Sequence, residues 1–241
     1  MSSAFLEPSR RRTALVTGVA SGIGAACAAA LAQAGWLVAG LDLHSPSGES
    51  TALALTADVA DPASVREAVR LTESRLGPVD ALVTAAGHYE ATAVDDITPE
   101  QWTRMLWVHL GGLVNPVRAL LPGMTERGGG SIVAITSELA IGGGDDGAHY
   151  AAAKGAVIGT VRSLAAETAA RGIRVNAVAP GPTDTPLLAP DSPWRAPAYL
   201  ETLPARRLAR PEEIASCVLF LLDEGTFCTG EVLSPNSGAV I

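Results

Sequence analysis

The chain has 241 residues, of which 48% are hydrophobic and only 4% are aromatic. At about 100–200 residues per domain, this length predicts one domain over residues 1–241, and the composition excludes a disordered or collagen-like chain. The 17 basic and 25 acidic residues give a net charge of −8, which argues against nucleic acid as a partner. Three cysteines without a CxxC spacing indicate neither a disulfide framework nor a metal site.

Short apolar runs alternate along the chain with longer Ala-rich stretches. The short runs predict strands and the long stretches predict helices. We expect strands at 13–17, 36–41, 52–56, 80–84, 131–136, 173–178 and 231–234, and helices at 22–34, 61–75, 98–124, 150–171 and 211–222. Such regular alternation predicts an α/β fold, a doubly wound parallel sheet of about seven strands with helices on both faces.

Three segments need a separate interpretation. Residues 1–11 are expected to be flexible, and the proline-rich segment 182–204 is expected to form a loop that covers a substrate site. The apolar run from Ile23 to Leu41 is broken by Gly35 and consists largely of Ala and Gly. It therefore indicates a buried helix and strand rather than a membrane span, and we expect a cytoplasmic protein that has no membrane partner.

A glycine-rich turn follows the first predicted strand, with the sequence TGVASGIG at residues 17–24. Glycines let a backbone approach a phosphate closely, and the helix that follows offers free N–H groups at its N-terminus. The turn therefore predicts a dinucleotide site, although glycines also serve ordinary loops. The candidate binding residues are Gly18, Ser21, Gly22, Ile23 and Gly24.

Asp42 ends the second predicted strand, about 18 residues after Gly24. A carboxylate at this spacing can accept hydrogen bonds from an adenosine ribose 2′-hydroxyl and repels a 2′-phosphate. No Lys or Arg occupies positions 19–21 or follows Asp42 directly. The pattern favours NAD over NADP, the alternative being a solvated Asp at a strand end.

Ser137, Tyr150 and Lys154 form the second candidate constellation. Residues four apart on a helix share one face, so the Lys154 ammonium can lie beside the Tyr150 phenol and lower its pKa from about 10. Ser137 lies at the carboxyl end of the fifth predicted strand, where sheets of this kind place ligands. Alone, the YxxxK spacing is weak, because it also occurs on ordinary surface helices.

These pieces occur in the order found in the short-chain dehydrogenase/reductase family, which the chain resembles from about Thr13 to its C-terminus. The pattern is closest to 3-oxoacyl-reductase-like members and to NAD-dependent alcohol dehydrogenases. Further matching pieces are Asp58-Val59, Ala85-Ala86-Gly87, IRVNAVAPGPTDTP at residues 173–186 and RPEEIA at residues 210–215. The resemblance implies a Rossmann-like fold and an NAD(P)-dependent enzyme that acts on CH–OH groups.

The resemblance also assigns roles to individual residues. It implies that Tyr150 exchanges a proton with the substrate oxygen, that Lys154 lowers the pKa of Tyr150 and holds the nicotinamide ribose, and that Ser137 orients the substrate. The remaining implied cofactor contacts are Asp58 and Val59 at the adenine, Ala85, Ala86 and Gly87 beside the cofactor, and Pro180, Gly181, Thr183 and Thr185 at the carboxamide.

The chain departs from the family pattern at two positions. Thr84 replaces the first Asn of the usual Asn-Ala-Ala-Gly, and its hydroxyl can still bond backbone groups. His109 replaces the Asn of the usual Val-Asn-Leu, which anchors a water in the proton relay beyond Lys154. An imidazole can also bond a water, so His109 is a fourth candidate catalytic residue. Its alternatives are a weakened relay and a packing residue.

The predicted substrate is a small neutral secondary alcohol or its ketone. Candidate pocket walls are His88, Tyr89, Glu138, Leu139, Ala140, Gly144, His149, Leu187, Leu188 and Trp194, and they include no cluster of Lys or Arg. Arg195, Arg206 and Arg207 keep a 3-oxoacyl thioester reductase that uses NADPH open as an alternative. A nucleotide-binding regulatory protein with weak or no catalysis is another. The family resemblance further implies a homotetramer.

Overall fold

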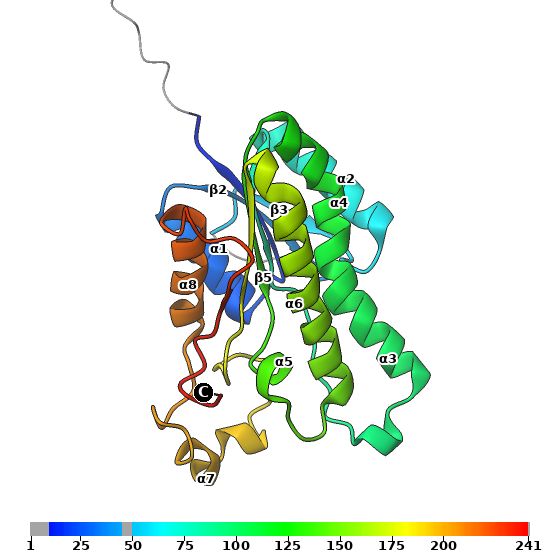
Figure 1. Cartoon of the computed structure of the whole chain (residues 1–241), viewed down its shortest axis with the longest axis vertical. Coiled ribbons are helices and arrows are strands. Elements are labelled where there is room, and N and C mark those ends of the chain that lie inside the picture. The colour runs from blue at the N-terminus through cyan, green and yellow to red at the C-terminus, as the bar shows by residue number, and fades with distance from the viewer. Residues whose placement is uncertain (1–9, 45–49, 241) are drawn as a thin grey trace, which may run out of the picture.

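The computed structural model describes residues 10–44 and 50–240, which form a seven-stranded parallel sheet in the order β3-β2-β1-β4-β5-β6-β7. Figure 1 shows this sheet between two layers of helices, and the predicted fold is confirmed. Each predicted strand is found within one or two residues of its expected bounds. The strands are β1 Thr13–Thr17, β2 Leu37–Asp42, β3 Leu53–Thr56, β4 Val79–Thr84, β5 Gly130–Ile135, β6 Ile173–Val178 and β7 Val232–Leu233.

The two helical layers enclose separate apolar clusters. Helices α2 (Pro62–Leu76), α4 (Gly112–Glu126) and α6 (Ala148–Thr168) pack on one face, whereas α1 (Gly22–Gln33) and α8 (Pro211–Asp223) pack on the other. Leu15 and Leu82 point into the first cluster, and Val16 and Val83 into the second. This period-two alternation along fully buried strands is what a sheet covered on both faces requires.

The long helix predicted at 98–124 has an internal interruption. Helix α3 (Pro99–Leu106) begins at the predicted Thr98 cap, but a π-helical turn, Trp107–Gly111, separates it from α4. Pro116 inside α4 has no N–H to donate to the preceding turn. The wider turn contains His109 and turns this side chain toward the sheet, where it is buried.

The carboxyl ends of the strands lie at the end of the molecule that carries α5 (Leu139–Gly142) and α7 (Pro197–Leu200). The start of the segment 182–204 lies beside the chain that follows its end. The Asp184 amide donates to the Ala209 carbonyl, and the Ala209 amide donates to the Pro182 carbonyl. The segment contains the turn Pro193–Arg195 as well as α7. Neither short helix was predicted. Among the described residues, no helix combines the length and apolar character needed to cross a membrane.

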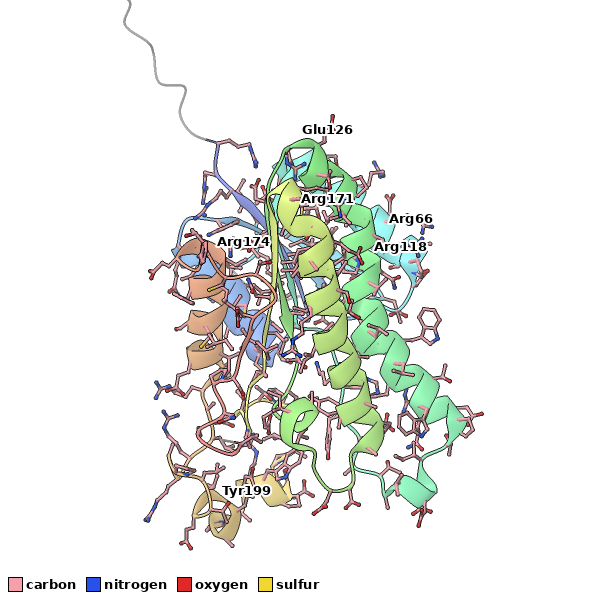
Figure 2. The ribbon with its side chains drawn as sticks, viewed as in Figure 1. Arg66, Arg118, Glu126, Arg171, Arg174 and Tyr199 are labelled. Carbon is pink, nitrogen blue, oxygen red and sulfur yellow. The ribbon has the colours of Figure 1, made fainter. Side chains whose placement is uncertain are left out.

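At the opposite end of the sheet, arginine side chains hydrogen-bond and ion-pair with neighbouring elements. Arg174 donates to the carbonyls of Leu221, Leu222 and Gly225 and so fixes the C-terminus of α8, and Figure 2 places it far from Tyr199 on α7. Arg10 forms an ion pair with Asp80 at 2.6 Å. Residues 1–9 of the segment predicted to be flexible lie outside the described residues, and Arg10 and Arg11 are held by hydrogen bonds.

Candidate active site

The glycine-rich turn brings backbone against backbone. Gly18 has φ +76°, and a Cβ atom there would lie 2.7 Å from the amide nitrogen of Ala86. A Cβ atom at Gly24 would lie 2.0 Å from the carbonyl oxygen of Gly18. Ser21 then begins α1, whose first N–H groups face the same cleft. The turn therefore fits a phosphate cradle, since both positions require glycine and the helix N-terminus is open.

A cleft of about 670 Å³ extends from this turn along the ends of β1, β2 and β4. Asp42 lies in its wall, where its carboxylate accepts hydrogen bonds from the amides of Ala20 (3.0 Å) and His44 (3.1 Å). Asp58 and Glu90 line the same cleft. Within the described lining the single Lys or Arg is Arg104, and its guanidinium is already paired with Glu90. The cleft is thus acidic.

Two residues outside the sequence prediction support this cleft from behind. The Thr17 hydroxyl accepts hydrogen bonds from the amides of Ala85 (3.1 Å) and Ala86 (3.2 Å), which joins β1 to the turn after β4. Asn115 is buried on α4 and donates to the carbonyl of Val59 at 2.9 Å. A lone amide on an apolar helix face is a signal that could have identified Asn115, and Thr17 is the first residue of the TGVASGIG motif, although it was not among the candidate binding residues.

A second, smaller cavity of about 110 Å³ opens beside the cleft and shares Ile23, Ala85, Gly87, Thr185 and Leu187 with it. All four candidate catalytic residues line this cavity: His109, Ser137, Tyr150 and Lys154. Pro180, Gly181 and Thr183 line it as well, as do the wall candidates Tyr89, Glu138, Leu139, Leu187, Leu188 and Trp194. The structure thus brings together residues as far apart in the sequence as Ile23 and Trp194.

Three of the candidate pocket-wall residues line neither the large cleft nor the small cavity. Ala140 and Gly144 do not line either cavity. His149 is fully buried against Trp102, with 6.0 Å between ring centres, and it also lines neither cavity. Its position one residue before Tyr150 suggested a wall, but adjacent helical residues point about 100° apart. His88 lines the large cleft instead of the small cavity.

Tyr150 and Lys154 lie on α6 and are both buried. Burial raises the pKa of the Tyr150 phenol, and the charge of Glu138 raises it further. Burial lowers the pKa of Lys154 to about 7. Its Nζ donates to the carbonyl of Ile135 at 2.9 Å and lies 5.7 Å from the centre of the Tyr150 ring. Lys154 therefore lies beside the Tyr150 ring while its Nζ is hydrogen-bonded to β5.

Ser137 makes a contact that was not anticipated. Its hydroxyl donates to Oε2 of Glu138 at 3.0 Å and accepts from the amide of Leu139 at 3.2 Å. Glu138 is 7% exposed, and burial raises the pKa of its carboxyl to about 6. The wall next to the phenol therefore carries a buried carboxylate, which an apolar strand sequence such as SIVAITSELA does not predict.

His109 is 5% exposed and contacts Tyr150 edge-on, with 5.3 Å between ring centres. Its Nε2 bonds the carbonyl of His88 at 2.8 Å, which fixes Nε2 as the protonated nitrogen. Among the described residues Nδ1 has no hydrogen-bond partner. Burial and the Lys154 charge hold the pKa of His109 well below 6.5. The ring thus offers a neutral acceptor at the cavity.

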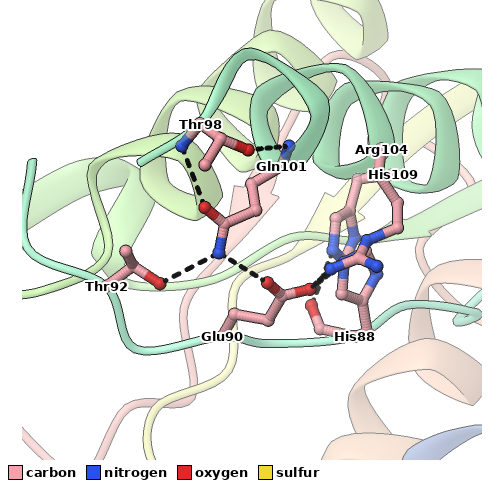
Figure 3. Close-up of polar contacts among 7 residues, drawn as sticks. All are labelled: His88, Glu90, Thr92, Thr98, Gln101, Arg104 and His109. Carbon is pink, nitrogen blue, oxygen red and sulfur yellow. Dashed lines mark hydrogen bonds and ion pairs between the residues drawn. The ribbon is translucent and has the colours of Figure 1, made fainter. Parts of the chain in front are cut away.

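Figure 3 shows what holds this part of the site. Glu90 pairs with Arg104 and receives a hydrogen bond from Gln101 at 3.1 Å. Gln101 also closes the cap of α3 with Thr98. The His88 ring stacks on His109 at 5.6 Å. The segment after β4 and the start of α3 therefore form one hydrogen-bonded unit behind His109.

Comparison with known proteins agrees with this arrangement. Residues 18–239 match the family model described as "Enoyl-(Acyl carrier protein) reductase". The chain is 39% identical to an acetoacetyl-CoA reductase of Synechocystis, with 92% of this chain and 93% of that protein covered. It is 36% identical to D-threitol dehydrogenase of Mycolicibacterium smegmatis, with 95% and 93% covered. The crystal structure of 3-ketoacyl-(acyl-carrier-protein) reductase from Brucella melitensis complexed with NADH superposes with a TM-score of 0.89 at 30% identity, covering 95% of this chain and 98% of that chain.

Proposed function

The chain belongs to the short-chain dehydrogenase/reductase family of NAD(P)-dependent oxidoreductases, and we propose that it interconverts a small secondary alcohol and its ketone with NAD(H), using Tyr150 as the acid/base. The observation that carries this proposal is the meeting of Ser137, Tyr150 and Lys154 in one cavity, directly beside a cleft that fits a dinucleotide. A regulatory protein that only binds nucleotides needs no such second cavity with a phenol and an amine.

Some residues of this chain would bind the cofactor, and others would transfer the proton. The glycine-rich turn, Asp42 and Asp58 would hold the adenosine half, and Thr183 and Thr185 the carboxamide. The nicotinamide supplies or accepts the hydride. Tyr150 would give its phenolic proton to a ketone oxygen or take the proton of an alcohol. Ser137 would turn its single hydroxyl proton from Glu138 to the same substrate oxygen, which leaves Oε2 of Glu138 free for another donor. Lys154 would bind the ribose, and Nδ1 of His109 would accept a hydrogen bond from a relay water.

NAD is the proposed cofactor because the adenosine end of the cleft is acidic. Asp42 already accepts two amide hydrogen bonds, so its carboxylate is fixed where the ribose hydroxyls would lie. A 2′-phosphate would meet Asp42 without a compensating cation, since Arg104 is paired with Glu90. The Brucella relative was crystallised in complex with NADH, which supports nicotinamide dinucleotide binding by a chain of this fold.

Reduction of 3-oxoacyl thioesters is the second candidate, supported by the names of relatives such as acetoacetyl-CoA reductase. A thioester carried on a phosphorylated arm would need cations at the cavity mouth. Arg195 is instead paired with Asp184 at 2.7 Å, and Arg207 with Glu213 at 2.7 Å. These two pairs favour a small neutral substrate, whereas Arg206 is exposed and has no ion pair among the described residues, which keeps the carried thioester as the second candidate.

We also infer that the segment 182–204 covers the substrate, since its residues Leu187, Leu188 and Trp194 line the cavity.

A cytoplasmic homotetramer is proposed on two grounds. The cysteines of the described chain are free thiols, as a reducing compartment permits. Trp107, between α3 and α4, is 55% exposed, which suits a subunit contact. Light scattering of the eluting protein tests the assembly.

The experiment that tests the function has two stages. The purified protein is titrated with NADH and with NADPH by fluorescence, and a panel of secondary alcohols and ketones is then assayed with each cofactor. We expect tighter NADH binding and turnover of small neutral alcohols. NADPH preference with turnover of acetoacetyl-CoA would establish the second candidate instead. Tight binding without turnover of any substrate would contradict both and indicate a regulatory protein.

A further inference from the structure

One wall of the small cavity carries a buried carboxylate that the acid/base mechanism does not use. Glu138 lies directly after β5, lines the cavity and is 7% exposed. Among the described residues no cationic side chain contributes to the pKa of this carboxyl, which burial raises to about 6. A buried acid without a cation is unfavourable unless hydrogen-bond donors satisfy it, so its place in a substrate cavity requires an explanation.

The donors that the protein itself provides leave part of the carboxylate free. Ser137 donates to Oε2, and the backbone N–H groups of Glu138 and Leu139 contribute to holding the charge. A carboxylate has about four acceptor sites. The Glu138 carboxylate can therefore take one more hydrogen bond, from whatever enters the cavity.

The contact with Ser137 fixes where that donor must lie. The two oxygens, Ser137 Oγ and Glu138 Oε2, are 3.0 Å apart. Hydroxyls on neighbouring carbons also lie about 3 Å apart when they are gauche, so two such hydroxyls can reach one oxygen each by ordinary O–H···O bonds. A reacting hydroxyl between Ser137 and Tyr150 would then place its neighbour beside Glu138.

The size and lining of the cavity restrict the molecule further. Its volume is about 110 Å³, much smaller than the 670 Å³ of the neighbouring cleft. Tyr89, Leu188 and Trp194 form apolar walls around the polar side. An anionic group beside Glu138 would face like-charge repulsion. The site therefore suits a short neutral molecule that carries a second hydrogen-bond donor.

We propose that Glu138 determines specificity by accepting a hydrogen bond from a second hydroxyl of the substrate, so that the protein acts on small neutral vicinal diols and polyols in preference to simple secondary alcohols. This inference rests on the proposed oxidoreductase function and names the substrate class of the same site. Glu138 selects the substrate, whereas Tyr150 transfers the proton.

The test compares butane-2,3-diol with butan-2-ol, which share one carbon skeleton, as kcat/KM at pH 8 with saturating NAD. The wild type should favour the diol by roughly ten- to a hundredfold, the range expected for one hydrogen bond to a charged group. In Glu138→Leu the ratio should fall to near one. In Glu138→Gln, which keeps an acceptor oxygen but no charge, it should fall by a smaller factor.

A matched control and an anionic substrate separate selection from a general structural effect. Glu126→Gln, at the exposed C-terminal end of α4 and outside both cavities, should keep the wild-type ratio. Turnover of 3-hydroxybutyrate relative to the diol should rise about tenfold in Glu138→Gln, which removes the repulsion and conserves the side-chain volume.

Two results would overturn the inference while leaving the proposed function intact. One is a wild-type ratio near one, and the other is an unchanged ratio in both Glu138 variants. Absence of turnover on both alcohols despite tight NADH binding would instead overturn the proposed function, and this inference with it.

Discussion

The ammonium of Lys154 donates to the carbonyl of Ile135 at 2.9 Å, and its nitrogen lies 5.7 Å from the centre of the Tyr150 ring. Burial acts in opposite directions on the two side chains. It lowers the pKa of Lys154 to about 7 and raises the pKa of Tyr150, because it disfavours the charged form of each group. In this form of the protein Tyr150 is therefore a neutral phenol over the whole physiological pH range.

This arrangement makes a spectroscopic prediction for the ligand-free protein. Tyrosinate absorbance, followed from pH 7 to about pH 10, should be the same in the wild type and in Tyr150→Phe, because Tyr150 does not ionise in that range. The signal of the half-buried Tyr89 and Tyr199, which is common to both proteins, serves as the internal reference. An additional tyrosinate in the wild type below pH 9 would show that Lys154 already acts on the phenol without a ligand.

Asp42 should control the choice of cofactor. In Asp42→Asn the side chain can still accept from the Ala20 amide, but the charge that repels a 2′-phosphate is lost. We expect the ratio of the dissociation constants for NADPH and NADH to fall at least about tenfold, the size of one lost charged interaction. Asp95→Asn, exposed in the turn before α3, is the control that should leave the ratio unchanged. If Asp42→Asn also leaves it unchanged, cofactor choice rests on other residues.

His109 should act as a neutral acceptor and not as a titrating base. Its pKa lies well below 6.5, so the pH–rate profile between pH 6 and 9 should have the same shape in the wild type and in His109→Asn. His109→Asn, which keeps an acceptor, should retain activity within about tenfold, whereas His109→Leu should lose more. Melting temperatures of both variants control for lost packing against Tyr150. If His109→Asn and His109→Leu had equal activities, the acceptor would not matter and His109 would be a packing residue.

Ionisation of the Glu138 carboxyl should lower the free energy of unfolding as pH rises. Its pKa is raised from 4.5 to about 6, so the folded state holds this proton more tightly than the unfolded state. The stability it contributes is present below pH 4.5 and lost as pH rises through 6, which corresponds to about 2 kcal/mol. Glu138→Gln should therefore unfold at a higher denaturant concentration than the wild type at pH 7.5 but not at pH 4. The same difference at both pH values would contradict this assignment.

The sequence predicted the sheet and its main helices well, because strands buried on both faces form short continuous apolar runs and the helices between them are longer Ala-rich stretches. It could not predict the π-helical turn at Trp107–Gly111, since no residue type in this stretch distinguishes a π-helical turn from an α-helical one. The helix Pro197–Leu200 was missed because its four residues are too short for a periodic pattern.

The site residues divide in the same way. Tyr150 and Lys154 could be paired from their spacing on one helix, and Asp42 from its place after β2. The partners of these groups are long-range contacts with no sequence signal. Ile135 holds Lys154 across 19 positions, and Asn115 reaches Val59 across 56. The carboxylate of Glu138 next to Ser137 is visible in the sequence, but its burial follows only from the fold.

The central claim is that Tyr150 is the acid/base, and one measurement tests it directly. Wild type and Tyr150→Phe are compared for turnover of the best alcohol in the panel and, on the same samples, for NADH affinity. Loss of a positioned acid/base should reduce kcat at least about a hundredfold, while NADH affinity changes by less than about threefold, because the phenyl ring keeps its packing. Turnover of Tyr150→Phe within tenfold of the wild type would contradict the account, since another group would then carry the proton.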